Sequence, residues 1–119
     1  MDERTNKWLE SIVIAIDELD AFFEMLPKEY ESFVSSVLLR RAVERNIEII
    51  GETLSRILKY DNTISIANAR KIIETWNYVR NYMIYSYDSL TVDILWSITV
   101  NHLPLLKTEV QELLKPIKA

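Results

Sequence analysis

Apolar residues recur at three- and four-residue steps along most of the chain, which is the spacing of helices with one buried face. The first such pattern covers residues 5–26, and we expect Pro27 to end the helix because proline cannot continue one. A second pattern covers residues 31–60. One side of it carries Val43, Ile47, Ile50, Leu54 and Ile57, and its other side carries Val34, Leu38, Ala42 and Ile49. Apolar side chains on two sides predict that this helix lies between its own core and a second subunit.

The segment Asp61-Asn62-Thr63 consists of turn- and cap-forming residues and separates the second helix from a third. The inner stripe of the third helix is expected to hold Ile66, Ile72, Ile73, Trp76, Val79 and Met83. Residues 88–91 form the next turn, in which Thr91 is the expected N-cap. Asp93 would then lie in the first turn of the last helix, where the helix dipole favours a carboxylate.

The last helix is predicted to contain a kink. Its apolar positions are Val92, Leu95, Trp96, Leu103, Leu106, Val110 and Leu113, and Pro104 lies among them. The proline ring excludes the backbone hydrogen bond to Val100, so we expect a bend there. The four patterns with short connections predict an all-α, antiparallel four-helix-type bundle with a Pro-kinked last helix. We expect residues 1–119 to form a single helical domain.

Composition narrows the class of protein without naming a function. The chain has 119 residues, of which 49% are hydrophobic and 27% charged, as in ordinary globular domains. It contains no cysteine, which excludes disulfides and thiolate metal sites, and we expect neither a metal nor a cofactor. A net charge of −4 argues against a general nucleic-acid coat but allows a local basic site. Without a signal peptide or a membrane span in this sequence, we expect a cytoplasmic protein.

The richest candidate chemistry lies late in the third helix, where Arg80-Asn81 is followed by Tyr85 and Tyr87. On a regular helix Arg80 and Tyr87 lie about 20° apart, whereas Arg80 and Tyr85 diverge by about 140°. These last two side chains therefore cannot share one face of a regular helix. Either the helix loosens near Ile84, or one cleft draws the two positions from different chains. Both alternatives favour a site at a dimer interface.

Two segments resemble the HepT-like branch of the HEPN superfamily, a group of bacterial toxin ribonucleases. The first is residues 41–52, which end in Ile50-Gly51-Glu52. The second runs from Val79-Arg80-Asn81 to Tyr85-Ser86-Tyr87-Asp88 and continues with residues 92–96 and 102–106. Their order, spacing and helical context agree with that branch over about residues 8–114. The resemblance implies a four-helix-type bundle that forms a homodimer, with an Arg-x4-His cleft at the subunit interface. It also implies a metal-independent RNase toxin, encoded beside a minimal nucleotidyltransferase antitoxin.

The resemblance assigns roles to individual residues. Arg80 would contact the scissile phosphate and Asn81 would position it, while Tyr87 would be the tyrosine that the partner adenylylates. Tyr85 stands where the family has histidine. An ordinary tyrosine, with a pKa near 10, is only about 0.1% ionised at pH 7 and is a poor general base. It can still donate a proton, hydrogen-bond a phosphate or stack on a base.

Three other features each allow a structural and a functional interpretation. Glu44, Glu48 and Glu52 form an acidic stripe that we interpret as a solvated salt-bridge ladder with nearby arginines; alternatively, Glu48 or Glu52 orients Arg80. His102, the only histidine, is interpreted as a structural or surface residue rather than a replacement base. Gly51, the only glycine, is expected to mark a close approach of another backbone where the second and third helices cross.

Three functional hypotheses follow. The first is the toxin component of a toxin–antitoxin module, with RNase activity impaired by Tyr85. The second is a non-catalytic homodimer that binds a nucleotidyltransferase partner or a nucleotide. The third is an interaction bundle whose tyrosines only pack an interface. RNA is a further expected ligand under the first hypothesis, and no membrane is expected as a partner.

Overall fold

The predicted helices converge on one apolar core in the computed structural model, which describes residues 2–83 and 89–114. The elements are α1 (Glu3–Met25), α2 (Tyr30–Ser35), α3 (Val37–Tyr60), α4 (Ala69–Met83), α5 (Ser89–Ser97), a π-helical turn η1 (Ile98–His102) and α6 (Leu103–Leu114). No strand occurs in the described ranges, which confirms the all-α class.

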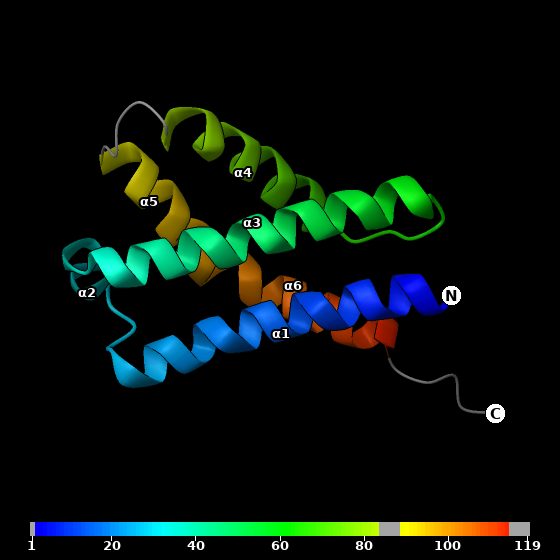
Figure 1. Ribbon diagram of the computed structural model, residues 1–119, viewed down its shortest axis with the longest axis horizontal. Coiled ribbons are helices and arrows are strands. Elements are labelled where there is room, and N and C mark those ends of the chain that lie inside the picture. Colours follow the sequence, from blue (N-terminus) through cyan, green and yellow to red (C-terminus); the bar gives the residue numbers. More distant parts are fainter. Residues whose placement is uncertain (1, 84–88, 115–119) are drawn as a thin grey trace.

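The helices form four antiparallel rods. α1 and α3 lie side by side in opposite directions, α4 runs back along the other side of α3, and α5, η1 and α6 together make the fourth rod (Figure 1). α6 returns along α1 and thereby closes the bundle. This arrangement confirms the predicted antiparallel four-helix-type bundle.

The core is formed by the inward stripes of all four rods. Its members include Leu9, Ile12, Ile16, Leu19, Val43, Ile47, Ile50, Leu54, Ile57, Ile72, Trp76, Val79, Leu95, Leu106 and Val110. Burial of each large aliphatic side chain contributes about 1.5–3 kcal/mol relative to exposure. One buried polar side chain also joins two rods, because Asn46 Nδ2 of α3 donates to the Ala15 carbonyl oxygen of α1 over 2.8 Å.

The first two helices differ from their predicted bounds at their ends. α1 begins at Glu3 because the Asp2 carboxylate accepts from the Thr5 amide, and it ends at Met25, so Leu26 is the C-cap rather than part of the helix. The predicted continuous helix over residues 31–60 was wrong, since Ser36 is extended and separates α2 from α3. The Ser36 hydroxyl accepts from the Leu39 amide and so caps a new helix.

The third helix starts later than predicted. Residues 61–68 are a connection, and Ile66 is buried within it rather than on the helix. A side chain from the far rod holds this connection, because the Glu109 carboxylate accepts from the amides of Ala67 and Asn68, at 2.6 and 3.2 Å. The start of α4, and with it the helix that carries Arg80, is therefore tied to α6.

The last rod departs from prediction at two points. Thr91 is not an N-cap, because it lies inside α5 and is buried. The interruption predicted at Pro104 takes the form of the π turn η1 directly before it, where the Leu103 amide bonds to the Ile98 carbonyl oxygen, five residues back. The wider turn accommodates the backbone ahead of a residue that has no N–H to donate.

A bilayer needs a long, continuous apolar helix. None of the helices within the described ranges has both the length and the apolar character to cross one.

Gly51 lies where α3 and α4 cross, as predicted, but its neighbour is a side chain rather than a backbone. A Cβ placed on Gly51 would lie 3.3 Å from Cδ1 and 3.4 Å from Cβ of Trp76. Trp76 is itself only 3% exposed, so its indole has little room to retreat. The missing Cβ thus sets the distance between the two helices.

We expect Gly51→Leu to destabilise the protein by about 1–3 kcal/mol, because the added side chain would overpack the Trp76 indole. Gly51→Ala is the matched control. Its methyl group needs a shift of only a few tenths of an ångström, and alanine regains about 1 kcal/mol of helix propensity. Thermal unfolding checks the pair; equal melting temperatures for the two variants would contradict this packing.

We expect Glu109→Gln to lower the free energy of unfolding by about 1–2 kcal/mol, since charge-assisted hydrogen bonds to two backbone amides are weakened. Glu18→Gln is the control, because Glu18 is exposed on α1. Denaturant unfolding measures both. An effect of Glu109→Gln no larger than that of the control would show that the connection before α4 is held by other contacts.

Candidate functional site

A groove opens between α3 and α4 beside Arg80. It has a volume of about 310 Å³. Its lining residues are Gly51, Glu52, Ser55 and Lys59 from α3, and Ile73, Trp76, Asn77 and Arg80 from α4. Within each helix these positions follow three- and four-residue steps, so each set shares one helix face. The groove is therefore built by two continuous helix surfaces.

The lining of the groove is cationic although the whole chain is acidic. Arg80 is exposed in the last turn of α4, where the helix dipole stabilises a cation. Within the described ranges, neither Arg80 nor Lys59 has an ion-pair partner, and Glu52 is the single carboxylate in the lining. Two unpaired cations against one carboxylate attract a phosphate, to which a guanidinium donates two parallel hydrogen bonds.

The lining of the groove includes one buried aromatic residue. Trp76 is 3% exposed, and its indole Nε1 has no hydrogen-bond acceptor in the described part of the chain. Asn77 follows it on the exposed side of α4 and offers both a donor and an acceptor. Polar and charged side chains make up most of the lining, which suits a polar or charged ligand.

The other predicted site residues are placed as follows. Asn81 is exposed on α4 and is absent from the described lining of the groove. Glu52 shares the groove with Arg80, but no ion pair joins them, and half-buried Glu48 is also unpaired with Arg80 among the described contacts. The orienting role of Glu48 or Glu52 and the phosphate contacts of Arg80 and Asn81 stay predictions.

Tyr85 and Tyr87 lie within residues 84–88, outside the described residues. Their predicted roles, as the substitute at the histidine position and as the adenylylation acceptor, stay predictions on the basis of the sequence. Arg80 lies four positions before Ile84, where this segment begins, and α4 is described as far as Met83.

The predicted salt-bridge ladder on α3 was wrong. Among the described residues the stripe forms one ion pair, between Arg41 Nη1 and Glu44 Oε2 at 3.3 Å, and Glu48 and Glu52 form none. Glu44 is not solvated, since its side chain is 8% exposed, and its Oε1 has no partner among the described residues. Its position seven residues before Gly51 places it on the face that packs against other helices, a spacing visible in the sequence.

His102 does not meet Arg80 within one chain. It is half-buried on η1 and lines a different pocket, between α4 on one side and α5 and η1 on the other. Arg80 lines the groove between α4 and α3. The Nδ1 atom of His102 is buried without a hydrogen-bond partner in the described part of the chain.

The sequence reasoning overlooked Lys59 and Asn77 in the Arg80 groove. Lys59 follows Gly51 and Ser55 at four-residue steps, and this spacing could have revealed it.

No group of three or more histidine or acidic side chains gathers as a metal site within the residues that the structure describes. The arrangement in the groove offers charge stabilisation and hydrogen bonding, which are the requirements for holding a phosphodiester.

Comparisons with known proteins agree on one family. The family model described as "Ribonuclease HepT-like" matches residues 12–113. A candidate RNase of Methanocaldococcus jannaschii is 31% identical over 86 residues, which cover 70% of this chain and 73% of that protein. No solved structure matches the chain significantly. The matched region includes α3, α4 and the whole Arg80 groove, and the chain therefore belongs to the HepT-like ribonuclease family.

Proposed function

We propose that this protein is the toxin component of a toxin–antitoxin module and binds RNA in the Arg80 groove, with cleavage made weak by Tyr85. The observation that supports the proposal most is that Arg80 and Lys59, neither of which has an ion-pair partner in the described ranges, both line a groove of about 310 Å³. That volume lies at the lower end of the range for small-ligand pockets and suits one nucleotide unit of a strand. Membership of a ribonuclease family supplies the substrate class.

The chemistry proposed is attack of the RNA 2′-hydroxyl on the adjacent phosphate. The 2′-oxygen forms a bond to phosphorus, the bond to the 5′-oxygen breaks, and a proton moves from the first oxygen to the second. Arg80 stabilises the charge on the phosphate. The reaction lacks a general base whose pKa lies near neutral pH, because position 85 is tyrosine and the only histidine in the sequence, His102, lines another pocket.

A homodimer is the proposed assembly. Arg80 and Tyr85 lie about 140° apart on a regular helix, so a cleft that uses both positions is more easily built from two chains. An exposed apolar groove supports an uncovered interface: Met25 and Leu38 are 83% and 81% exposed, and they line a groove of about 450 Å³ with Leu26 and Ala42. Leu38 and Ala42 belong to the second apolar side of α3, for which we propose a second copy of the chain as the cover.

A minimal nucleotidyltransferase is the proposed antitoxin partner, and Tyr87 is the proposed acceptor of its adenylyl group. The family resemblance is the support for both statements. Arg80 is seven residues before Tyr87, and on a regular helix positions seven apart lie about 20° from each other, so under this proposal the modified tyrosine would bring a phosphate near Arg80.

A second candidate function is a homodimeric binding module that holds a partner or a nucleotide without cutting RNA. Tyrosine at position 85 favours it, because a phenol is a poor base near neutral pH. The two candidates differ in one observable, which is whether the protein cleaves RNA at any measurable rate.

The RNase proposal is tested by restoring the missing base. We expect the unchanged protein to cleave a fluorescent RNA slowly and Tyr85→His to cleave about 10²–10⁴-fold faster, the usual contribution of a general base. Adding Arg80→Ala to Tyr85→His should abolish the gain, while adding Arg56→Ala, an exposed cation outside the groove, should not.

Fast cleavage by the unchanged protein that disappears in Tyr85→Phe would overturn the proposal of impaired chemistry, because the phenol would then be the working group. No cleavage by either the unchanged protein or Tyr85→His would favour the binding module.

The dimer proposal predicts that Leu38→Glu converts the protein into a monomer, because a carboxylate would have to be buried in an apolar interface. Leu105→Glu is the control, since Leu105 is 56% exposed but lies on α6. Light scattering coupled to size-exclusion chromatography gives the mass. A dimer that survives Leu38→Glu unchanged would show that this surface is not the interface.

A further inference from the structure

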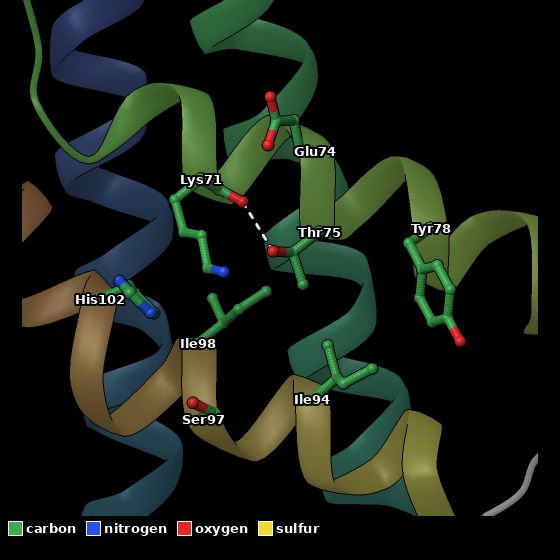
Figure 2. A pocket seen from close by; sticks show the side chains of 8 residues that line it. All are labelled: Lys71, Glu74, Thr75, Tyr78, Ile94, Ser97, Ile98 and His102. Atoms are coloured by element: carbon green, nitrogen blue, oxygen red, sulfur yellow. Dashed lines mark hydrogen bonds between the residues drawn. The ribbon is translucent and has the colours of Figure 1, made fainter.

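α4 borders a second pocket on the side away from the Arg80 groove. Its volume is about 360 Å³, and α5 and η1 form its opposite wall. The residues that matter are Lys71, Thr75 and Tyr78 from α4, Ile94 from α5, and Ile98 and His102 from η1 (Figure 2). The Arg80 groove uses Ile73, Trp76, Asn77 and Arg80, so the two pockets open on different faces of one helix and share no lining residue.

His102 lines this pocket from the π turn η1. His102 is the last residue of η1, and its Nδ1 is buried without a hydrogen-bond partner among the described residues. An imidazole nitrogen is always a donor or an acceptor, and leaving one buried and unpaired costs free energy. π turns occur mostly as single turns within α-helices, frequently at functional sites. Because Nδ1 is covered by protein atoms, Nε2 is the ring nitrogen of His102 that a ligand in the pocket can reach.

Lys71 brings a cation to the same place. Its side chain reaches into the pocket on the side of His102, whereas the Glu74 carboxylate points away from the cavity (Figure 2). No ion pair is formed by Lys71 in the described ranges. Thr75 donates its hydroxyl proton to the Lys71 carbonyl oxygen at 2.7 Å, so this hydroxyl keeps only acceptor capacity. Lys71 and His102 are donors for an anion, and the Ser97 hydroxyl, which accepts from Asn101 Nδ2, can add a third.

The remainder of the wall is apolar. Ile94 and Ile98 project from the α5 and η1 side, and the Tyr78 ring lies at the far end from His102 (Figure 2). The pocket therefore has a cationic end and an apolar end. A ligand that satisfies both has an anionic group joined to a flat apolar part, and a volume of about 360 Å³ limits it to a small molecule.

We propose that this pocket binds an organic phosphate of mononucleotide size. The phosphoryl group lies between the Lys71 ammonium and the His102 imidazole, and the ring of the ligand lies against Ile94, Ile98 and Tyr78. A phosphoryl group suits the cationic end because several oxygens can accept from the ammonium and the imidazole together. The site is separate from the Arg80 groove, and it stands whether or not that groove cuts RNA.

The single histidine makes the test specific. In long-range ¹H–¹⁵N NMR spectra the imidazole signals belong to His102 alone. The probes are adenosine monophosphate, adenosine and inorganic phosphate. We expect adenosine monophosphate to shift these signals saturably, inorganic phosphate to do so more weakly, and adenosine to have little effect.

Variants locate the site. Lys71→Gln should weaken binding of adenosine monophosphate by about tenfold or more, because a charge-assisted contact is lost. Arg70→Gln, which removes an exposed cation one position earlier on α4, should leave the affinity unchanged. Melting temperatures check that every variant is folded.

Three results would overturn the proposal: no saturable shift with adenosine monophosphate at millimolar concentration, equal binding of adenosine, or binding that persists in Lys71→Gln but is lost in Arg80→Ala. The last result would place the ligand in the Arg80 groove.

Discussion

The contact between Gly51 of α3 and Trp76 of α4 is the constraint on which the rest of the structure depends. Because Gly51 has no Cβ, the indole packs directly against the α3 backbone face and brings the two helices together. The groove beside Arg80 is bounded by both residues, and so its width follows from this contact. The same helix, α4, presents its other face to α5 and η1, where the second pocket lies. One close approach therefore positions both candidate sites.

The fold and the chemistry are supported by different features of the chain. The bundle depends on apolar stripes, on Asn46 bridging α3 and α1, and on Glu109 tying the start of α4 to α6. None of these requires a histidine at position 85. A family member can thus retain the helices and the cationic groove while the proton-transfer residue changes, because the contacts named above join residues outside the 84–88 segment.

The sequence predicted the four-rod bundle because apolar periodicity near 3.6 reports buried helix faces directly. The sequence-based prediction failed where hydrogen bonding by a single polar residue, or local packing, determined where a helix begins or is interrupted. Ser36 divides the second helix because its hydroxyl caps α3, and a serine is a much weaker signal than a proline. Thr91 looked like a cap but is buried inside α5, and the bend at Pro104 became a π turn whose hydrogen bonding depends on the surrounding packing.

The candidate site residues were predicted where a sequence motif contains them and missed where only tertiary packing brings them together. Arg80 was found from a motif, and the structure places it in a groove with Glu52. Lys59 and Asn77 carry no motif, and the facing of two helices, which depends on tertiary packing, brings them beside it. The burial of Glu44 was hidden because regular charge spacing is typical of a solvated ladder as well. The unpaired nitrogen of His102 lies on the π turn, and a prediction that assumed a regular helix could not have revealed it.

We propose that the Arg80 groove holds an RNA phosphate although proton transfer next to it is impaired by Tyr85. A binding titration of intact single-stranded RNA at several salt concentrations is the most direct test. We expect saturable binding that weakens with salt, and a lower affinity and a shallower salt dependence for Arg80→Ala than for the unchanged protein. An affinity and a salt dependence that are the same for both proteins would contradict it.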